Sequence, residues 1–285
     1  MVVSPPPNRQ ADIVARLRAA GCVFAEDEAR LLVSAARTPA ELAAMVARRA
    51  DDGLPLEHVL GWAEFRGLRI AVDPGVFVPR RRTEFLVEQA VLGDRGTDDD
   101  PGADGPVVVD LCCGSGAVGV AVVAALGRAD LHAVDLDPAA ARCARRNVSA
   151  VGGRVYTGDL YGPLPRTLRG RVAVLVANAP YVPTGEIGLM PPEARVHEPM
   201  VALDGGGDGL DVLRRVIGSA AQWLAPGGHL LFETSRSQAS AIIDVVSRHG
   251  LRPRVAHCDE VGATAVICTT VDGHGGPAEG VSPRT

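Results

Sequence analysis

The stretch Val107-Val-Val-Asp110-Leu-Cys-Cys-Gly114-Ser-Gly116 joins an apolar run to a glycine turn, and the apolar segment 117–126 follows directly. A strand, a turn with two glycines and a helix form an arrangement in which the backbone can approach a ligand closely. Downstream, short apolar runs alternate with amphipathic segments. This alternation favours an α/β fold with a mostly parallel sheet covered by helices on both faces.

The rest of the chain is divided by its apolar periodicity and its turn residues. We expect strands at 107–111, 131–134, 155–159, 172–177, 229–232, 254–257 and 263–269, and helices at 83–91, 117–126, 138–148, 210–224 and 238–249. Residues 11–60 are expected to form a small helical domain, 61–82 a β-hairpin linker, and 83–271 the main domain. The Pro-rich or Gly-rich ends, 1–10 and 272–285, are expected to be disordered, and the acidic segment 94–106 to be a mobile loop.

Composition excludes several classes of protein. The net charge of −5 and the aromatic content of 4% disfavour a nucleic-acid reader, which would be basic and rich in stacking side chains. All 29 basic residues are Arg, so catalysis by a lysine is excluded. Apolar runs of about 10 residues are too short to span a membrane, and no secretory signal is evident. The six cysteines show no Cys-x-x-Cys spacing, which predicts reduced thiols, a cytoplasmic location and no metal site.

Three acidic residues lie at or after the ends of the predicted strands around the glycine turn. Asp135 ends the next predicted strand, where a carboxylate can accept hydrogen bonds from ribose hydroxyls. Asp110 would repel a pyrophosphate but attract the amino group of a sulfonium cofactor, so the charges favour S-adenosylmethionine over NAD. Asp159, after the third strand, is placed to accept the adenine amino group. The alternative is that the glycines only make a tight turn and Asp135 only caps a helix.

The sequence Asn178-Ala179-Pro180-Tyr181 follows the apolar run 172–177. A carboxamide nitrogen is a poor nucleophile, so an enzyme must hold it in line and accept its hydrogens. The side-chain oxygen of Asn178 can accept one N–H, and the carbonyl of Ala179, aimed by the following proline, can accept another. Tyr181 supplies a flat wall for the planar acceptor. In isolation these residues would indicate an ordinary turn.

From about residue 11 to residue 270 the chain resembles the protein-(glutamine-N5) methyltransferases of the HemK/PrmC type, which modify the Gln of the Gly-Gly-Gln motif in peptide chain release factors. The resemblance rests on motifs spread along the chain: Gly61–Gly67, Phe77–Arg80 with Thr83-Glu84, Asp110–Gly116, Asp135, Asn178–Tyr181, Glu198-Pro199, 205–211, and Gly227-Gly228 leading to Glu233. It implies a class I methyltransferase domain preceded by a helical substrate-recognition domain and a hairpin linker. It also implies that S-adenosylmethionine is bound by Asp110, Cys112, Gly114, Gly116, Asp135, Leu136, Asp159, Leu160 and Asn178, and that the substrate Gln is held by Asn178, Ala179, Pro180 and Tyr181.

The chain departs from the family pattern at several positions. Ala179 stands where the family usually has a first proline, which removes some stiffness from the loop. The Cys112-Cys113 pair replaces Gly-Thr or similar residues. Arg80 matches the family and is expected to support the cofactor pocket, whereas Arg81 and Arg82 are expected to be solvated. Glu198 is expected to bind a loop backbone.

Two other functions fit the same residues. An amino-methyltransferase acting on adenine in nucleic acid faces the same geometric problem at an exocyclic amine. A protein that binds the cofactor without turnover would retain the glycine turn and Asp135. Transfer of methyl groups without a metal or a covalent intermediate to a protein glutamine, most simply that of a release factor, is the function that the combined motifs favour.

Overall fold

The computed structural model describes residues 7–93 and 105–270. Its helices are α1 (Pro7–Ala19), α2 (Ala25–Ala35), α3 (Pro39–Ala50), α4 (Leu56–Leu60), α5 (Glu84–Gly93), α6 (Ala117–Leu126), α7 (Pro138–Val148), α8 (Pro192–His197), α9 (Asp211–Ala220) and α10 (Arg236–Arg248), with short 3-10 turns η1 (Arg81–Thr83), η2 (Ser149–Val151), η3 (Arg166–Leu168), η4 (Thr184–Leu189) and η5 (Met200–Ala202). Its strands are β1 (Trp62–Phe65), β2 (Leu68–Ala71), β3 (Val107–Leu111), β4 (Asp130–Asp135), β5 (Arg154–Thr157), β6 (Val172–Ala177), β7 (Leu224–Glu233), β8 (Leu251–Cys258) and β9 (Ala263–Thr270).

A seven-stranded sheet organises the main body of the protein, with strand order β5-β4-β3-β6-β7-β9-β8. The strands from β5 to β7 are parallel, and β9 and β8 close the edge in antiparallel register. The expected mostly parallel α/β sheet is therefore confirmed. The strand order reverses direction between β3 and β6, and such a switch point opens a crevice at the carboxyl ends of the strands.

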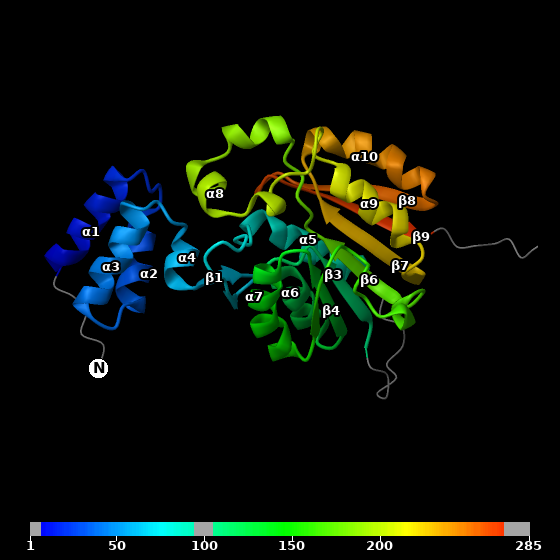
Figure 1. The fold of residues 1–285 in the computed structure, drawn as a ribbon, viewed down its shortest axis with the longest axis horizontal. Coiled ribbons are helices and arrows are strands. Elements are labelled where there is room, and N and C mark those ends of the chain that lie inside the picture. Colours follow the sequence, from blue (N-terminus) through cyan, green and yellow to red (C-terminus); the bar gives the residue numbers. More distant parts are fainter. Residues whose placement is uncertain (1–6, 94–104, 271–285) are drawn as a thin grey trace, which may run out of the picture.

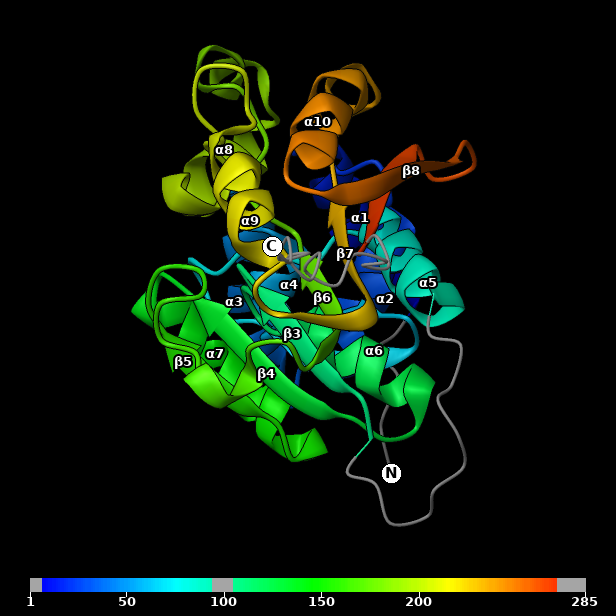
Figure 2. The same cartoon turned by 90° about the vertical axis from the view of Figure 1, so that its right-hand side faces the viewer.

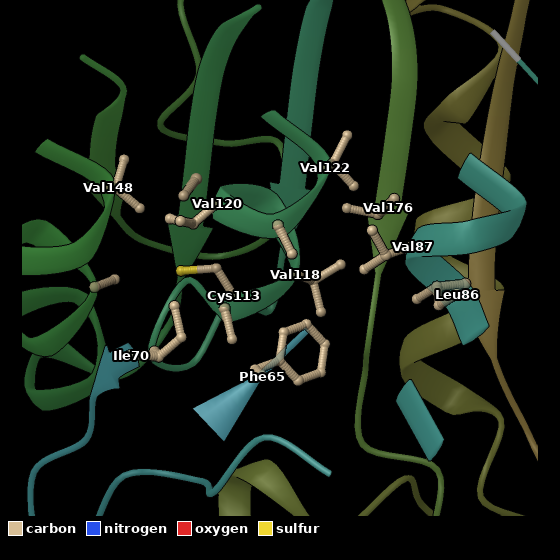
Figure 3. Close-up of a cluster of buried hydrophobic side chains, with 14 of the residues drawn as sticks. Phe65, Ile70, Leu86, Val87, Cys113, Val118, Val120, Val122, Val148 and Val176 are labelled. Carbon is tan, nitrogen blue, oxygen red and sulfur yellow. The ribbon is translucent and has the colours of Figure 1, made fainter. Parts of the chain in front are cut away.

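Helices cover both faces of this sheet (Figure 2). On one face, α5, α6 and α7 bury a cluster that also takes in the hairpin residues Phe65 and Ile70 (Figure 3). On the other face, α9 and α10 pack against a second cluster that includes Phe232 and Trp223. All five residues of β3 are buried, which explains why its sequence is a continuous apolar run interrupted only by Asp110.

The first four helices form a separate bundle beside the sheet (Figure 1). They bury their own apolar cluster, with Leu17 and Leu32 fully inside. Thr38 caps α3 by accepting a hydrogen bond from the backbone N–H of Glu41. The bundle is joined to the linker by His58, whose Nε2 lies 2.8 Å from the carbonyl oxygen of Val76. Burial lowers the pKa of this imidazole.

The loosely alternating stretch 65–78 predicts the hairpin of the linker, but the observed hairpin lies slightly earlier in the chain, at 62–71. Phe65 pairs with Leu68, so only Arg66 and Gly67 form the turn. Both turn residues have positive φ, of 50° and 73°, which is the conformation of a two-residue hairpin whose twist matches its strands. After Ala71 the chain makes a turn in which the N–H of Val76 donates to the carbonyl oxygen of Asp73, and Phe77 follows this turn.

Two other boundaries differ from expectation. The helix expected over 210–224 ends at Ala220, because Leu224 already pairs with Val172 as the first residue of β7. The proline and glycines expected to close that helix instead lie within β7, where the register shifts. The segment 1–10 was expected to be disordered, but α1 begins at Pro7, since proline is well accommodated in a first helical turn. Residues 1–6, the acidic segment 94–104 and the tail 271–285 lie outside the described residues.

Candidate active site

A cavity opens at the carboxyl ends of β3, β4, β5 and β6, at the switch point of the sheet. Its lining includes the predicted residues Asp110, Cys112, Gly114, Asp135, Leu136, Asp159, Leu160, Asn178 and Pro180. Of the remaining predicted residues, Gly116, Ala179 and Tyr181 do not line it. Its empty volume is about 1000 Å³, which includes the open space at its mouth.

Asp110 is the most unusual group in this cavity. It is 1% exposed, and its Oδ2 accepts a hydrogen bond from the backbone N–H of Gly119 over 2.9 Å. Its Oδ1 is buried and has no hydrogen-bond partner in the described part of the chain. Burial raises the pKa of this carboxyl to about 7. An unpartnered buried carboxylate oxygen in a cavity wall fits a cationic ligand group, such as the amino group of S-adenosylmethionine.

The close approach of α6 to Asp110 depends on a glycine that the sequence analysis missed. Gly119 completes the spacing Gly114-Ser-Gly116-Ala-Val-Gly119, and a Cβ at this position would lie 2.9 Å from Asp110 Oδ2. The third glycine of such a turn permits close packing of the helix on the strand, so its spacing was the available signal.

Gly116 acts through packing. It adopts φ of +79° at the start of α6, and a Cβ there would lie 2.8 Å from Val148 Cγ2 on α7. We expect Gly116→Ala to destabilise the fold by about 2–4 kcal/mol, from left-handed strain and overpacking together. Gly170→Ala is the matched control, because Gly170 has φ of +69° but open space around it. Urea unfolding should show a clearly smaller loss for the control; equal losses would contradict the packing role.

Asp135 ends β4 and organises the glycine turn. Its Oδ2 accepts a hydrogen bond from the backbone N–H of Gly114 over 2.7 Å, and its Oδ1 accepts one from the N–H of Asp137 over 2.8 Å. Burial raises the pKa of this carboxyl, although the two N–H groups act in the opposite direction. Both oxygens keep a free lone pair direction, and the neighbouring Leu136 is 52% exposed beside the cavity.

Asp159 and Leu160 follow β5 at the far side of the cavity. Asp159 forms an ion pair with Arg215 of α9, which also lines the cavity. Leu160 has φ of 44°, a conformation that costs a non-glycine residue energy and holds this loop in a tight bend. Cys112 has φ of 55°, and burial and nearby carboxylates raise the pKa of its thiol, which suits packing and not nucleophilic chemistry.

The acceptor loop, which we define as Asn178–Tyr181, leaves the end of β6 next to the glycine turn. Asn178 is half-buried and lines the cavity together with Pro180. Ala179 is 2% exposed and packs into the apolar cluster below α9. The segment 205–209 packs closely against the acceptor loop. A Cβ at Gly209 would lie only 2.3 Å from the carbonyl oxygen of Tyr181.

The segment after the hairpin forms another wall, through Phe77, Pro79 and Thr83. As expected, Glu198 binds a loop backbone: it accepts from the N–H of Val78 over 3.1 Å and from Arg80 Nη2 over 2.6 Å. Arg82 is exposed, as expected, but its hydrogen bonds to other segments were not expected. Its guanidinium is hydrogen-bonded to Tyr181 and Glu233, since the chain returns to this point from two distant strand ends.

The described residues were also compared with what a metal site or a membrane-spanning helix requires, and neither is found among them. Within residues 7–93 and 105–270, no group of three or more His, Cys, Asp or Glu side chains is arranged to hold a metal ion. None of the helices in those ranges is both long and apolar enough to cross a membrane. The six cysteines are free thiols.

Comparisons with known proteins agree with this geometry. The methyltransferase small domain family matches residues 69–208. The release factor glutamine methyltransferase of Gloeobacter violaceus is 40% identical over 212 residues, which cover 73% of this chain and 71% of that protein. A 4-amino-L-phenylalanine/4-methylamino-L-phenylalanine methyltransferase of Streptomyces pristinaespiralis is 38% identical over 200 residues, 68% and 66% of the two chains.

A solved methyltransferase structure from Pyrococcus furiosus shares the fold, with a TM-score of 0.52 and 16% identity over 72% of this chain and 89% of that one. The sheet order, the helices on both faces and the cavity at the switch point are thus those of a class I methyltransferase. Taken with the identity and coverage of the curated relatives, they show that this chain belongs to the family of release factor glutamine methyltransferases.

Proposed function

We propose that this protein transfers a methyl group from S-adenosylmethionine to the side-chain amide nitrogen of a glutamine in a peptide chain release factor. The observation that carries the proposal is a single cavity lined by both Asp110, whose buried Oδ1 has no partner in the described part of the chain, and Asn178. One group suits the cationic part of the cofactor and the other suits an amide acceptor. The reaction and the substrate are proposed from the family to which the chain belongs.

Each predicted residue has a proposed role at the cofactor. Asp110 would hold the amino group, Asp135 the ribose hydroxyls, and Asp159 with Leu160 the adenine. Gly114 would leave room for the cofactor over the backbone of the turn, and Cys112 and Leu136 would give apolar walls. Gly116 does not line the cavity and would support the same turn through its packing against α7. When bound, the cofactor supplies an electrophilic methyl group on a sulfonium.

The acceptor loop has the task of orienting the amide nitrogen. Asn178 Oδ1 and the carbonyl of Ala179 are the two acceptors proposed for its N–H groups. Pro180 restricts the loop. Tyr181 does not line the cavity, so its proposed place is at the edge of the acceptor, beside the loop. A strong general base is unnecessary, because an amide that has been alkylated on nitrogen is strongly acidic and loses its proton readily.

We further propose roles for the other segments. Residues 11–60 would recognise the protein substrate, 61–82 would link that domain to the sheet, and 83–271 would carry out the transfer. The six free thiols are typical of a reducing compartment, so we infer a cytoplasmic location.

Mass spectrometry tests this proposal. The purified protein and S-adenosylmethionine should add one methyl group to the Gln of the Gly-Gly-Gln tryptic peptide of a release factor. Parallel reactions with labelled cofactor and RNA, DNA, 4-amino-L-phenylalanine or total extract protein test the other acceptors. A methylated nucleic acid or aromatic amine with an unmodified release factor would overturn the assignment, and cofactor binding without any product would indicate a protein that lacks turnover.

A further inference from the structure

Four side chains form a hydrogen-bonded group beside the acceptor loop, which we call the Glu233 cluster: Arg82, Thr83, Tyr181 and Glu233. The hydroxyl of Tyr181 donates to Glu233 Oε1 over 2.7 Å, and the hydroxyl of Thr83 donates to Oε2 over 2.6 Å. Arg82 donates twice, from Nε to Glu233 Oε1 over 3.0 Å and from Nη2 to the hydroxyl oxygen of Tyr181 over 2.8 Å. The Tyr181 hydroxyl therefore has two partners, Glu233 and Arg82, and Glu233 is itself held by Thr83 and Arg82.

Burial makes this arrangement rigid. The Glu233 side chain is 5% exposed, and a buried carboxylate is costly unless donors surround it, as three do here. Burial and the adjacent carboxylate raise the pKa of Tyr181, so its hydroxyl keeps its proton and remains a donor. The Arg82 side chain is 47% exposed, so it can be changed with little effect on the core.

The cluster stands between the active-site cavity and a second cavity of about 810 Å³. Thr83 and Pro180 face the first, while Arg82, Tyr181 and Glu233 line the second. Its members come from η1, from the loop after β6 and from the end of β7. The strands β6 and β7 run side by side in the sheet (Figure 2). The cluster thus ties the linker to the acceptor loop across the carboxyl edge of the sheet.

We propose that Arg82 and Glu233 are positioning residues for methyl transfer, which hold Tyr181 and thereby aim the Asn178 and Ala179 acceptors; this role rests on the proposed function. The main chain of the loop is held separately, by Gln238 Nε2 donating to the carbonyl oxygen of Tyr181 over 2.9 Å. At Ala179 the backbone lacks the restriction of a proline ring, so side-chain contacts of Tyr181 carry more of the alignment. Reactivity of a positioned amide falls steeply with small displacements.

The test compares Arg82→Ala, Tyr181→Phe and the double variant, with Arg81→Ala as the matched control on the exposed side of η1. We expect Arg82→Ala and Tyr181→Phe each to lower kcat about tenfold. The kcat of the double variant should be no lower than that of the more impaired single variant, because the two substitutions remove the same constraint on the loop. The Kd of the cofactor should stay within twofold of the wild-type value, and Arg81→Ala should behave as wild type.

A second readout does not depend on the acceptor. Hydrogen exchange of the peptide spanning 177–184 should become faster in Arg82→Ala and not in Arg81→Ala, with exchange in β3 and β4 unchanged. Additive losses in kcat, or unchanged exchange in an active protein, would overturn the positioning role. If the wild-type protein leaves the release factor unmodified, the proposed function fails, while the exchange measurement still decides whether Arg82 holds the loop.

Discussion

Asn178→Ala should lower kcat by about 100- to 1000-fold, the usual cost of removing one preorganised hydrogen-bonding group from a reaction centre. Asn178 lines the same cavity as the glycine turn, at the end of β6. The cofactor lies mainly over Asp110 and Asp135 in our proposal, so its Kd should change no more than threefold. Steady-state methylation of a release factor and calorimetric titration with the cofactor measure the two quantities on the same preparation.

Asn178→Asp is the matched variant for this prediction. A carboxylate keeps the acceptor oxygens but loses the donor N–H groups of the amide. If Asn178 acts by accepting the hydrogens of the nucleophile, Asn178→Asp retains at least tenfold more activity than Asn178→Ala. Equal activities of the two variants, or a Kd that rises as much as kcat falls, would contradict the assigned role.

The site could be located from sequence because its parts follow strand ends. Asp110, Asp135 and Asn178 each come directly after or within an apolar run, and parallel strands bring their carboxyl ends to one edge. Local patterns carry this information, because a buried parallel strand is marked by continuous apolar residues. The start of α10 was also visible in principle, since Ser235 and Gln238 form a capping box.

Local sequence patterns do not predict contacts between segments that lie far apart in the chain. Arg82 reads as a solvated residue in a run of three arginines, yet its partner Glu233 lies 151 positions away. Gln238, whose side chain holds the carbonyl of Tyr181, reads only as a polar residue on a helix. Such contacts depend on how three chain segments meet, and no periodicity within one segment encodes them.

Asp110→Asn should weaken cofactor binding about 10- to 100-fold, because it removes a buried carboxylate of the cavity wall whose Oδ1 has no partner within residues 7–93 and 105–270. The same change should stabilise the cofactor-free protein. Burial raises the pKa of Asp110 to about 7 in the folded chain, against 3.8 for an unperturbed Asp. Ionising it within the fold therefore costs on the order of 4 kcal/mol above pH 7, which the neutral Asn avoids.

The sign of the pH dependence separates this role from a structural one. Because the folded pKa lies above the unfolded pKa, the stability that Asp110 contributes is complete below about pH 4 and is lost as the pH rises through 7. The stability difference between Asp110→Asn and wild type should thus widen from pH 4 to pH 8 in thermal melts without cofactor. Cofactor affinity should show the opposite trend in the wild type, weakening about tenfold per unit as the pH falls below 7, since the carboxylate must be ionised to hold a cation. Asp110→Asn should abolish that pH dependence; a variant whose affinity still falls with pH as in the wild type would show that another group holds the amino group.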